Sequence, residues 1–188
     1  MSSLLIVDGF SLAFRAFYAY PLNLTLSSGQ PINAVFGFIT LLLQAIDELA
    51  PDYILVCFDR PEPTFRDDAY ELYKANRSEA PDEFKSQVDL FKDITKQAGI
   101  CCLEQAGYEA DDIMGACATF AAQQGLHTYV YTSDQDAFQL VNELTQVVSA
   151  KKGQLNLYVY DRERVFDKCG VYPEEIIDFK ALKGDTSD

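Results

Sequence analysis

Short apolar runs alternate with longer segments of helical period along this chain, and that alternation constrains the fold more than any other feature. The strongest runs are rich in β-branched and aromatic residues, as is typical of strands buried on both faces: Ser3–Asp8, Tyr53–Asp59 and His127–Thr132. The weaker strand candidates are Ile100–Glu104 and Thr145–Ser149, and the helix candidates are Asn33–Leu49, Asp82–Gln97, Asp111–Gln124 and Glu174–Leu182. This alternation predicts an α/β fold with a mostly parallel central sheet flanked by helices.

Composition and charge narrow the class of protein. With 188 residues, 48% of them hydrophobic, the chain has the size and apolar content of one folded domain. Its formal net charge of −14 argues against a generally basic nucleic-acid coat protein, and its many large apolar residues exclude a disordered acidic tail. No apolar run reaches the roughly 18 residues that span a bilayer. The N-terminal run has no basic region before it and is cut by Asp8, so we expect no signal peptide and no membrane partner.

Cysteine and histidine usage limits the chemistry and points to a compartment. The five cysteines form no Cys-x-x-Cys pair, which together with the absent signal favours the reducing cytoplasm and no disulfide framework. His127 is the only histidine, and a structural role is the simpler interpretation because it begins a strand-like run. A zinc site built on cysteine and histidine, a Ser-His-Asp triad and a Cys-His pair are therefore disfavoured.

Carboxylates follow all three of the strongest strand candidates. Two runs end in Asp8 and Asp59, and the third is followed at once by Asp134 and Asp136. In an open parallel sheet the carboxyl ends of the strands share one edge, and that edge binds ligands. The sequence therefore predicts that these four side chains converge, although they are far apart along the chain.

Two further groups of acids belong to the same predicted edge. Glu109, Asp111 and Asp112 open a helix just after a weaker strand, and Asp185 and Asp188 lie in the terminal Gly-Asp-Thr-Ser-Asp loop. Each acid alone has an ordinary explanation, because aspartate caps helices and suits turns. Seven clustered carboxylates would repel one another and raise their own pKa values, and bound cations would relieve that repulsion. Oxygen ligands select Mg²⁺ or Mn²⁺, so the pattern indicates a two-metal site for phosphodiester chemistry.

One stretch does not fit the βαβ plan. From residue 64 to residue 81 charges and tyrosines alternate with little apolar periodicity, which predicts an exposed excursion, partly helical, that stands off the sheet. Lys74 and Arg77 lie three residues apart and would share a helix face, an arrangement suited to gripping a phosphate or, equally, to a solvated surface. Phe14, Phe17 and Tyr18 have helical spacing, which is more typical of core packing than of a base-stacking platform.

Five ordered blocks of sequence resemble a known family. They are Leu5–Tyr18, Pro63–Arg77, Gly107–Asp112, Thr132–Leu140 and Gly184–Asp188. In order and spacing they are similar to the 5′-nuclease domain of bacterial DNA polymerase I, of the flap endonuclease family. The resemblance implies a PIN-like fold over residues 1–188 with a helical arch at about 64–85. It also implies a Mg²⁺-dependent 5′-3′ exonuclease and flap endonuclease that hydrolyses DNA with two ions, which Mn²⁺ can replace, in replication and repair.

The same resemblance assigns roles residue by residue. It implies a first metal site of Asp8, Asp59, Glu109 and Asp111, and a second of Asp134, Asp136 and Asp188, with Asp111 as the bridging carboxylate. It implies that Asp112 and Asp185 are further acids of the cluster, and that Lys74 and Arg77 are arch residues that contact the scissile phosphate. Arg15 resembles a phosphate-contacting residue, and Tyr18 or Tyr73 would stack on an unpaired base.

The chain also departs from the family pattern. Phe10 stands where members usually carry histidine or asparagine, and the chain ends at Asp188, before the expected helix-hairpin-helix and polymerase regions. The implied partners are DNA with 5′ flaps, nicks or free 5′ ends, and RNA primers on DNA. Two alternatives stay open: a PIN-like ribonuclease, which the Tyr-Lys-Ala-Asn-Arg excursion disfavours, and a non-catalytic module that binds DNA junctions. A dehalogenase-type phosphatase is poorer still, because Asp8 is not followed by the second aspartate of an Asp-x-Asp motif.

Overall fold

A six-stranded sheet forms the centre of the molecule, of which the computed structural model describes residues 2–70, 73–74, 79–150 and 157–184. The strand order is β3-β2-β1-β4-β5-β6; all neighbours run parallel except β6, which is antiparallel to β5. The strands are β1 Ser3–Asp8, β2 Tyr53–Cys57, β3 Cys101–Leu103, β4 His127–Tyr131, β5 Thr145–Ala150 and β6 Leu157–Tyr160. The predicted α/β class is confirmed, and the strand order reverses between β1 and β4, where open α/β sheets bind ligands.

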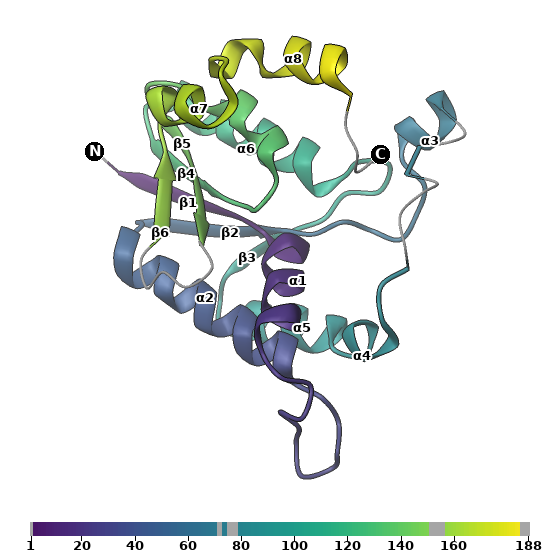
Figure 1. Cartoon of the computed structure of the whole chain (residues 1–188). Coiled ribbons are helices and arrows are strands. Elements are labelled where there is room, and N and C mark those ends of the chain that lie inside the picture. The colour runs from purple at the N-terminus through teal and green to yellow at the C-terminus, as the bar shows by residue number, and fades with distance from the viewer. Residues whose placement is uncertain (1, 71–72, 75–78, 151–156, 185–188) are drawn as a thin grey trace.

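Helices cover both faces of this sheet (Figure 1). One face carries α1 Gly9–Ala19, α2 Asn33–Leu49, α4 Asp82–Lys85 and α5 Val88–Gln97. The other carries α6 Ala110–Gln123, η1 Gln135–Leu140, α7 Arg162–Cys169, η2 Pro173–Glu175 and α8 Ile176–Lys183. The short helix α3 Phe65–Ala69 stands apart at the carboxyl edge.

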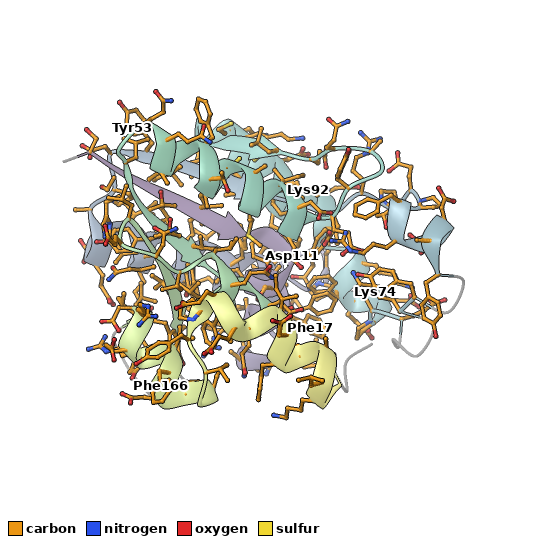
Figure 2. The ribbon with its side chains drawn as sticks, turned by 90° about the horizontal axis from the view of Figure 1, so that it is seen from above. Phe17, Tyr53, Lys74, Lys92, Asp111 and Phe166 are labelled. Atoms are coloured by element: carbon orange, nitrogen blue, oxygen red, sulfur yellow. The ribbon has the colours of Figure 1, made fainter. Side chains whose placement is uncertain are left out.

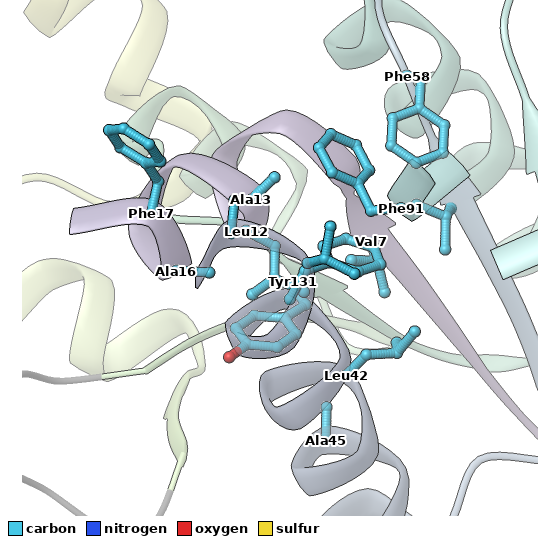
Figure 3. Close-up of a cluster of buried hydrophobic side chains, with 14 of the residues drawn as sticks. Val7, Leu12, Ala13, Ala16, Phe17, Leu42, Ala45, Phe58, Phe91 and Tyr131 are labelled. Atoms are coloured by element: carbon cyan, nitrogen blue, oxygen red, sulfur yellow. The ribbon is translucent and has the colours of Figure 1, made fainter. Parts of the chain in front are cut away.

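The central strand shows why the sheet is buried on both sides. In β1, Leu5 and Val7 join the cluster beneath α1 and α2, whereas Leu4 and Ile6 join the cluster beneath α6. Figure 3 shows Val7 among side chains from α1, α2 and α5. Burying one such aliphatic side chain contributes about 1.5–3 kcal/mol, so an apolar run of four in one strand fixes the middle of the fold.

The predicted helix Asp82–Gln97 is two helices, separated by Ser86 and the buried Gln87. The Gln87 side chain accepts hydrogen bonds from the backbone N–H groups of Ala34 (2.9 Å) and Val35 (3.3 Å), at the start of α2. Its amide donates to Asn33 Oδ1 (3.0 Å) and to the carbonyl of Glu83 (2.9 Å). Gln87 thus caps α2, whose first N–H groups lack partners within the helix.

The elements that were not predicted from periodicity include β6 and α7. The strand β6 forms an antiparallel pair with β5. In the helix α7, Val165 is the only buried residue, so the helix has no apolar stripe. End signals were nevertheless present: Asp161 caps α7 by accepting from Arg164 N (2.9 Å), and Gly170 ends it with φ +77°. Among the described residues, no helix is both long and apolar enough to cross a membrane.

Candidate active site

A cleft of about 1020 Å³ opens at the carboxyl edge of the sheet. Its acidic lining comes from the ends of strands and the starts of helices: Asp8, Asp59, Asp89, Glu109, Asp111 and Asp134. Basic side chains line the same cleft, namely Arg60, Lys74, Lys92, Lys180 and Lys183. Figure 2 shows Asp111 at the start of α6, with Lys74 and Lys92 toward the arch side. All of these acids except Asp89 were expected at this edge, and the structure places them in one cleft.

Asp8 lies at the floor of the cleft, where β1 ends and α1 begins. Its Oδ1 accepts from Ser11 N (2.9 Å), which caps α1, and its Oδ2 accepts from the Thr132 hydroxyl (2.8 Å) at the end of β4. The residue is 7% exposed. Burial, against the lowering effect of these two hydrogen bonds, raises the pKa of Asp8 to about 6, and the nearby Asp59 and Asp134 add repulsion.

Asp111 stands in the first turn of α6 and opens to the cleft. Asp111 is exposed to solvent, but the walls of the cleft surround its carboxyl group and keep part of the water away from it. That desolvation, followed by repulsion from Asp8, Asp134 and Asp59, raises the pKa of Asp111 to about 7. In the part of the chain that the structure describes, no donor is hydrogen-bonded to this carboxylate. A cation beside Asp111 would lower this pKa again, because it would stabilise the charged carboxylate.

Asp59 and Asp134 are fixed by backbone groups near them in space. Asp59 follows β2 and accepts from Ala110 N (2.8 Å), which ties the end of that strand to the start of α6. Asp134 caps the 3₁₀ helix η1 by accepting from Asp136 N (2.8 Å), and its own N–H donates to Thr132 Oγ1 (3.1 Å). Of these two acids only Asp134 has the capping role expected of a single aspartate, and both side chains line the cleft.

Glu109 is engaged by the predicted arch. One carboxylate oxygen accepts from Lys74 Nζ (2.8 Å), the other accepts from the Tyr73 hydroxyl (3.0 Å), and Arg66 Nη1 lies 3.7 Å away. Lys74 has φ +55°, a left-handed backbone that costs a side-chain-bearing residue about 1–2 kcal/mol. Ionic contacts to Glu109 therefore hold a strained residue over the cleft.

Two of the predicted acids are turned to other partners. Asp112 forms a bidentate ion pair with Arg66, at 2.7 and 2.8 Å, and these hydrogen bonds lower the pKa of Asp112 below its usual value. Asp136 forms an ion pair with Lys180 of α8. Neither residue lines the main cleft, so the expected cluster of seven divides into five lining acids and two that pair with cations at its margin.

The predicted DNA-contacting residues are spread more widely. Lys74 lines the cleft and Tyr73 reaches Glu109, whereas Tyr18 is 73% exposed on α1, and neither Arg15 nor Tyr18 is part of the cleft lining. Arg77, Asp185 and Asp188 lie outside the described residues. The packing interpretation is confirmed for Phe17, which is buried, and Phe14 stacks on Phe84 with 3.9 Å between ring centroids.

Phe10, the departure from the family pattern, belongs to an aromatic cluster at one wall of the cleft. Its ring meets Phe58 edge-on at 5.8 Å and Phe91 at 6.1 Å. Lys92 Nζ lies 5.5 Å from the Phe10 ring centroid and forms an ion pair with Glu104 (2.8 Å). An imidazole or amide at position 10 would lack this apolar packing.

Sequence reasoning missed several residues that shape the cleft. Arg66 and Lys92 lie in segments where charges alternate, and nothing local marks the partner of either one: Asp112 is 46 residues from Arg66, and Glu104 is 12 residues from Lys92. Phe179 and Lys183 of α8 complete the lining from the far side of the sheet. The only sequence signal for Arg66 was indirect: it lies within Pro63–Arg77, one of the five blocks that resemble the 5′-nuclease family.

The cleft offers the oxygen atoms that a hard cation such as Mg²⁺ prefers, but its described acids are not close enough together to hold one. All six lining acids offer oxygen ligands, and burial, followed by repulsion from neighbouring acids, raises the pKa values of Asp8 and Asp111. Among the residues that the structure describes, however, no three His, Cys, Asp or Glu side chains are grouped so that they could hold an ion. Glu109 is one reason, because it faces Lys74 and Tyr73.

The parallel sheet, with acids at the ends of its strands and a helical excursion over them, defines a PIN-like α/β domain of the 5′-nuclease type. The flap endonuclease of bacteriophage T5, in a complex with DNA and metal ions, superposes with a TM-score of 0.74 at 20% identity, over 99% of this chain and 68% of that one. A sequence profile described as 5′-3′ exonuclease, N-terminal resolvase-like domain, matches residues 3–170. The chain belongs to that family.

Two relatives show how much of a longer protein this chain represents. It is 43% identical over 187 residues to DNA polymerase I of Mycobacterium tuberculosis, covering 99% of this chain and 21% of the relative. It is 42% identical over 188 residues to the 5′-3′ exonuclease of Aquifex aeolicus, covering 100% of this chain and 63% of the relative. The chain therefore spans about a fifth of the first protein and less than two thirds of the second.

Proposed function

We propose that this chain is the catalytic domain of a Mg²⁺-dependent, structure-specific 5′-nuclease that acts on DNA in replication and repair in the cytoplasm. As a 5′-3′ exonuclease and flap endonuclease it would hydrolyse phosphodiester bonds. The observation that carries the proposal is one cleft in which Asp8, Asp59, Asp111 and Asp134 face Lys74 of the excursion. Membership of the 5′-3′ exonuclease family supports the reaction class.

The acids of the cleft are the proposed metal ligands. Asp8, Asp59, Glu109 and Asp111 would hold one ion; Asp134, Asp136 and Asp188 would hold the other, with Asp111 shared and Asp112 and Asp185 nearby. Bound Mg²⁺ or Mn²⁺ would supply an activated water and neutralise charge on the reacting phosphate. The raised pKa values of Asp8 and Asp111 support this assignment, because each carboxylate gains most from a nearby cation.

The excursion is the proposed arch, at about residues 64–85, and its basic residues would bind the substrate. Lys74 lies 2.8 Å from Glu109, so its ammonium can pass from that carboxylate to a phosphate entering the cleft. Arg77 would act beside Lys74 on the scissile phosphate. Arg15, Tyr18 and Tyr73 are proposed contacts to the backbone and to an unpaired base.

The proposed partners are DNA with 5′ flaps, nicks or free 5′ ends, including RNA primers paired with DNA. The T5 flap endonuclease, which shares the fold, was crystallised with DNA and metal ions. Because the curated relatives are longer than this chain, we propose that a helix-hairpin-helix region, and in polymerase relatives a polymerase region, contributes to DNA binding in the whole protein.

Cleavage of a 5′-labelled flap duplex in Mg²⁺, Mn²⁺ or EDTA tests the proposal. We expect metal-dependent cuts near the junction, and none in EDTA. An all-RNA flap, assayed in parallel, separates a nuclease for DNA from a ribonuclease. Binding of the junction without cleavage, by this chain and by a version extended to the length of the Aquifex relative, would instead favour a non-catalytic junction-binding module.

A further inference from the structure

The first leg of the proposed arch, residues 64–69, packs against residues 107–112, where α6 begins. Phe65 N donates to the carbonyl of Gly107 (3.2 Å), and the Phe65 ring lies 5.9 Å from the ring of Tyr108. Thr64 caps α3 through a capping box with Asp67, so the leg enters this contact with a defined backbone. The contacts join α3 to the segment that carries Glu109, Asp111 and Asp112.

Two ionic contacts strengthen this docking, and they differ in kind. Arg66 and Asp112 share two short, parallel hydrogen bonds, and the Asp112 side chain also accepts from Glu109 N (3.0 Å) within the capping box of α6. Lys74 and Tyr73 instead each make one hydrogen bond to Glu109, which lines the cleft. A bidentate arginine pair has a fixed geometry, whereas a lysine ammonium exchanges partners readily.

We propose that Asp112 is a positioning residue rather than a metal ligand, and that its ion pair with Arg66 anchors the arch to the start of α6. The anchor holds Lys74 over the cleft while Lys74 exchanges Glu109 for a substrate phosphate, and the carboxylate of Glu109 is then open to a cation. The inference rests on the proposed function, because it concerns how the arch residue Lys74 is presented to DNA. It gives a structural role to Asp112, which the resemblance placed in the acidic cluster but outside the two metal sites.

Four single variants of this chain test the anchor. Arg66→Gln removes the anchor and leaves the α6 cap intact, and Asp112→Asn removes it from the other side. Asp111→Asn serves as the comparator for a proposed ligand. Arg162→Gln is the control matched in charge, since Arg162 of α7 is paired with Glu174 of η2, away from the arch.

Three measurements are made on each variant: trypsin cleavage after Lys74 and Lys85, Mn²⁺ affinity by calorimetry, and steady-state cleavage of a 5′-flap duplex. We expect trypsin to cut the arch at least about fivefold faster in Arg66→Gln and Asp112→Asn, because opening of the docked leg exposes it. Their Mn²⁺ affinity should stay within about twofold of wild type, whereas KM should rise about tenfold with a smaller change in kcat. Arg162→Gln should match wild type throughout.

Two results would overturn the anchor. One is an Asp112→Asn protein that loses Mn²⁺ affinity as strongly as Asp111→Asn, which would make Asp112 a ligand. The other is an Arg66→Gln protein with wild-type trypsin cleavage, which would leave the docking independent of the ion pair. Since proteolysis needs neither DNA cleavage nor metal, it decides the anchor even if the wild-type chain fails to cut DNA and the proposed function falls.

Discussion

The floor of the cleft and the proposed arch above it are held in place by different kinds of contact. On the floor, Asp8 and Asp134 cap the elements that directly follow them, so each carboxylate is positioned by backbone N–H groups two or three residues ahead. In the arch, Arg66 and Lys74 depend on side-chain ion pairs to residues 46 and 35 positions away. The floor is therefore positioned partly by local backbone contacts, to which Asp8 and Asp59 add contacts with distant residues, whereas the described contacts of the proposed arch to the cleft are all set by the tertiary fold.

Asp111→Asn is the sharpest test of the floor and carries the largest expected effect. If Asp111 is the shared carboxylate, its loss should lower kcat about 10³-fold, which corresponds to about 4 kcal/mol of barrier. The fold should survive, because the change removes a charge that Asp8, Asp134 and Asp59 repel. Flap-cleavage kinetics and a thermal melt in EDTA measure the two effects. Turnover near that of wild type would remove the two-metal assignment.

Gln87→Ala tests the opposite end of the arch, which returns to the core through α4 and α5. The substitution leaves the N–H groups of Ala34 and Val35 and the Asn33 side chain without their buried partner. We expect a loss of about 3 kcal/mol of unfolding free energy, measured by urea denaturation, because unsatisfied buried groups bear their full desolvation cost. Ser86→Ala, whose exposed hydroxyl donates to the Glu83 carbonyl, is the neighbouring control. Equal stabilities for the two variants would show that Gln87 is not what joins the arch to α2.

The difference between floor and arch also explains what the sequence could predict. Asp8 and Asp59 end apolar strands, and strand period together with the rule for parallel sheets is enough to place them at one edge. The Arg66–Asp112 pair has no local signature, since it depends on how the excursion returns to α6. The same reasoning accounts for α7, where burial of Val165 alone gives no apolar periodicity, and for Gln87, whose polar side chain finds its buried partners on α2, more than 50 residues away.

The pH dependence of stability is the smallest expected effect and tests the floor alone. Burial raises the pKa of Asp8 to about 6 from an ordinary value near 3.8, so the native state binds more protons than the unfolded chain between these values. The stability contributed by protonated Asp8 is fully present below about pH 4 and is lost as pH rises through 6. From pH 5 to pH 7.5 in EDTA, Asp8 should therefore lower the unfolding free energy by about 1 kcal/mol. Asp111 acts in the same direction, up to about pH 7.

Asp8→Asn isolates this contribution, because an asparagine oxygen can still accept from Ser11 N and keep the α1 cap. Urea denaturation of both proteins at pH 5 and pH 7.5 should show a shallower pH dependence in the variant. Arg66 is the counterpart in the arch: its partner Asp112 has a lowered pKa and stays ionised through this window, so Arg66→Gln should leave the slope unchanged. If the unfolding free energies of wild type and Asp8→Asn changed equally with pH, Asp8 would carry no buried charge at neutral pH. The raised pKa of Asp8 would then no longer support a cation at the floor of the cleft.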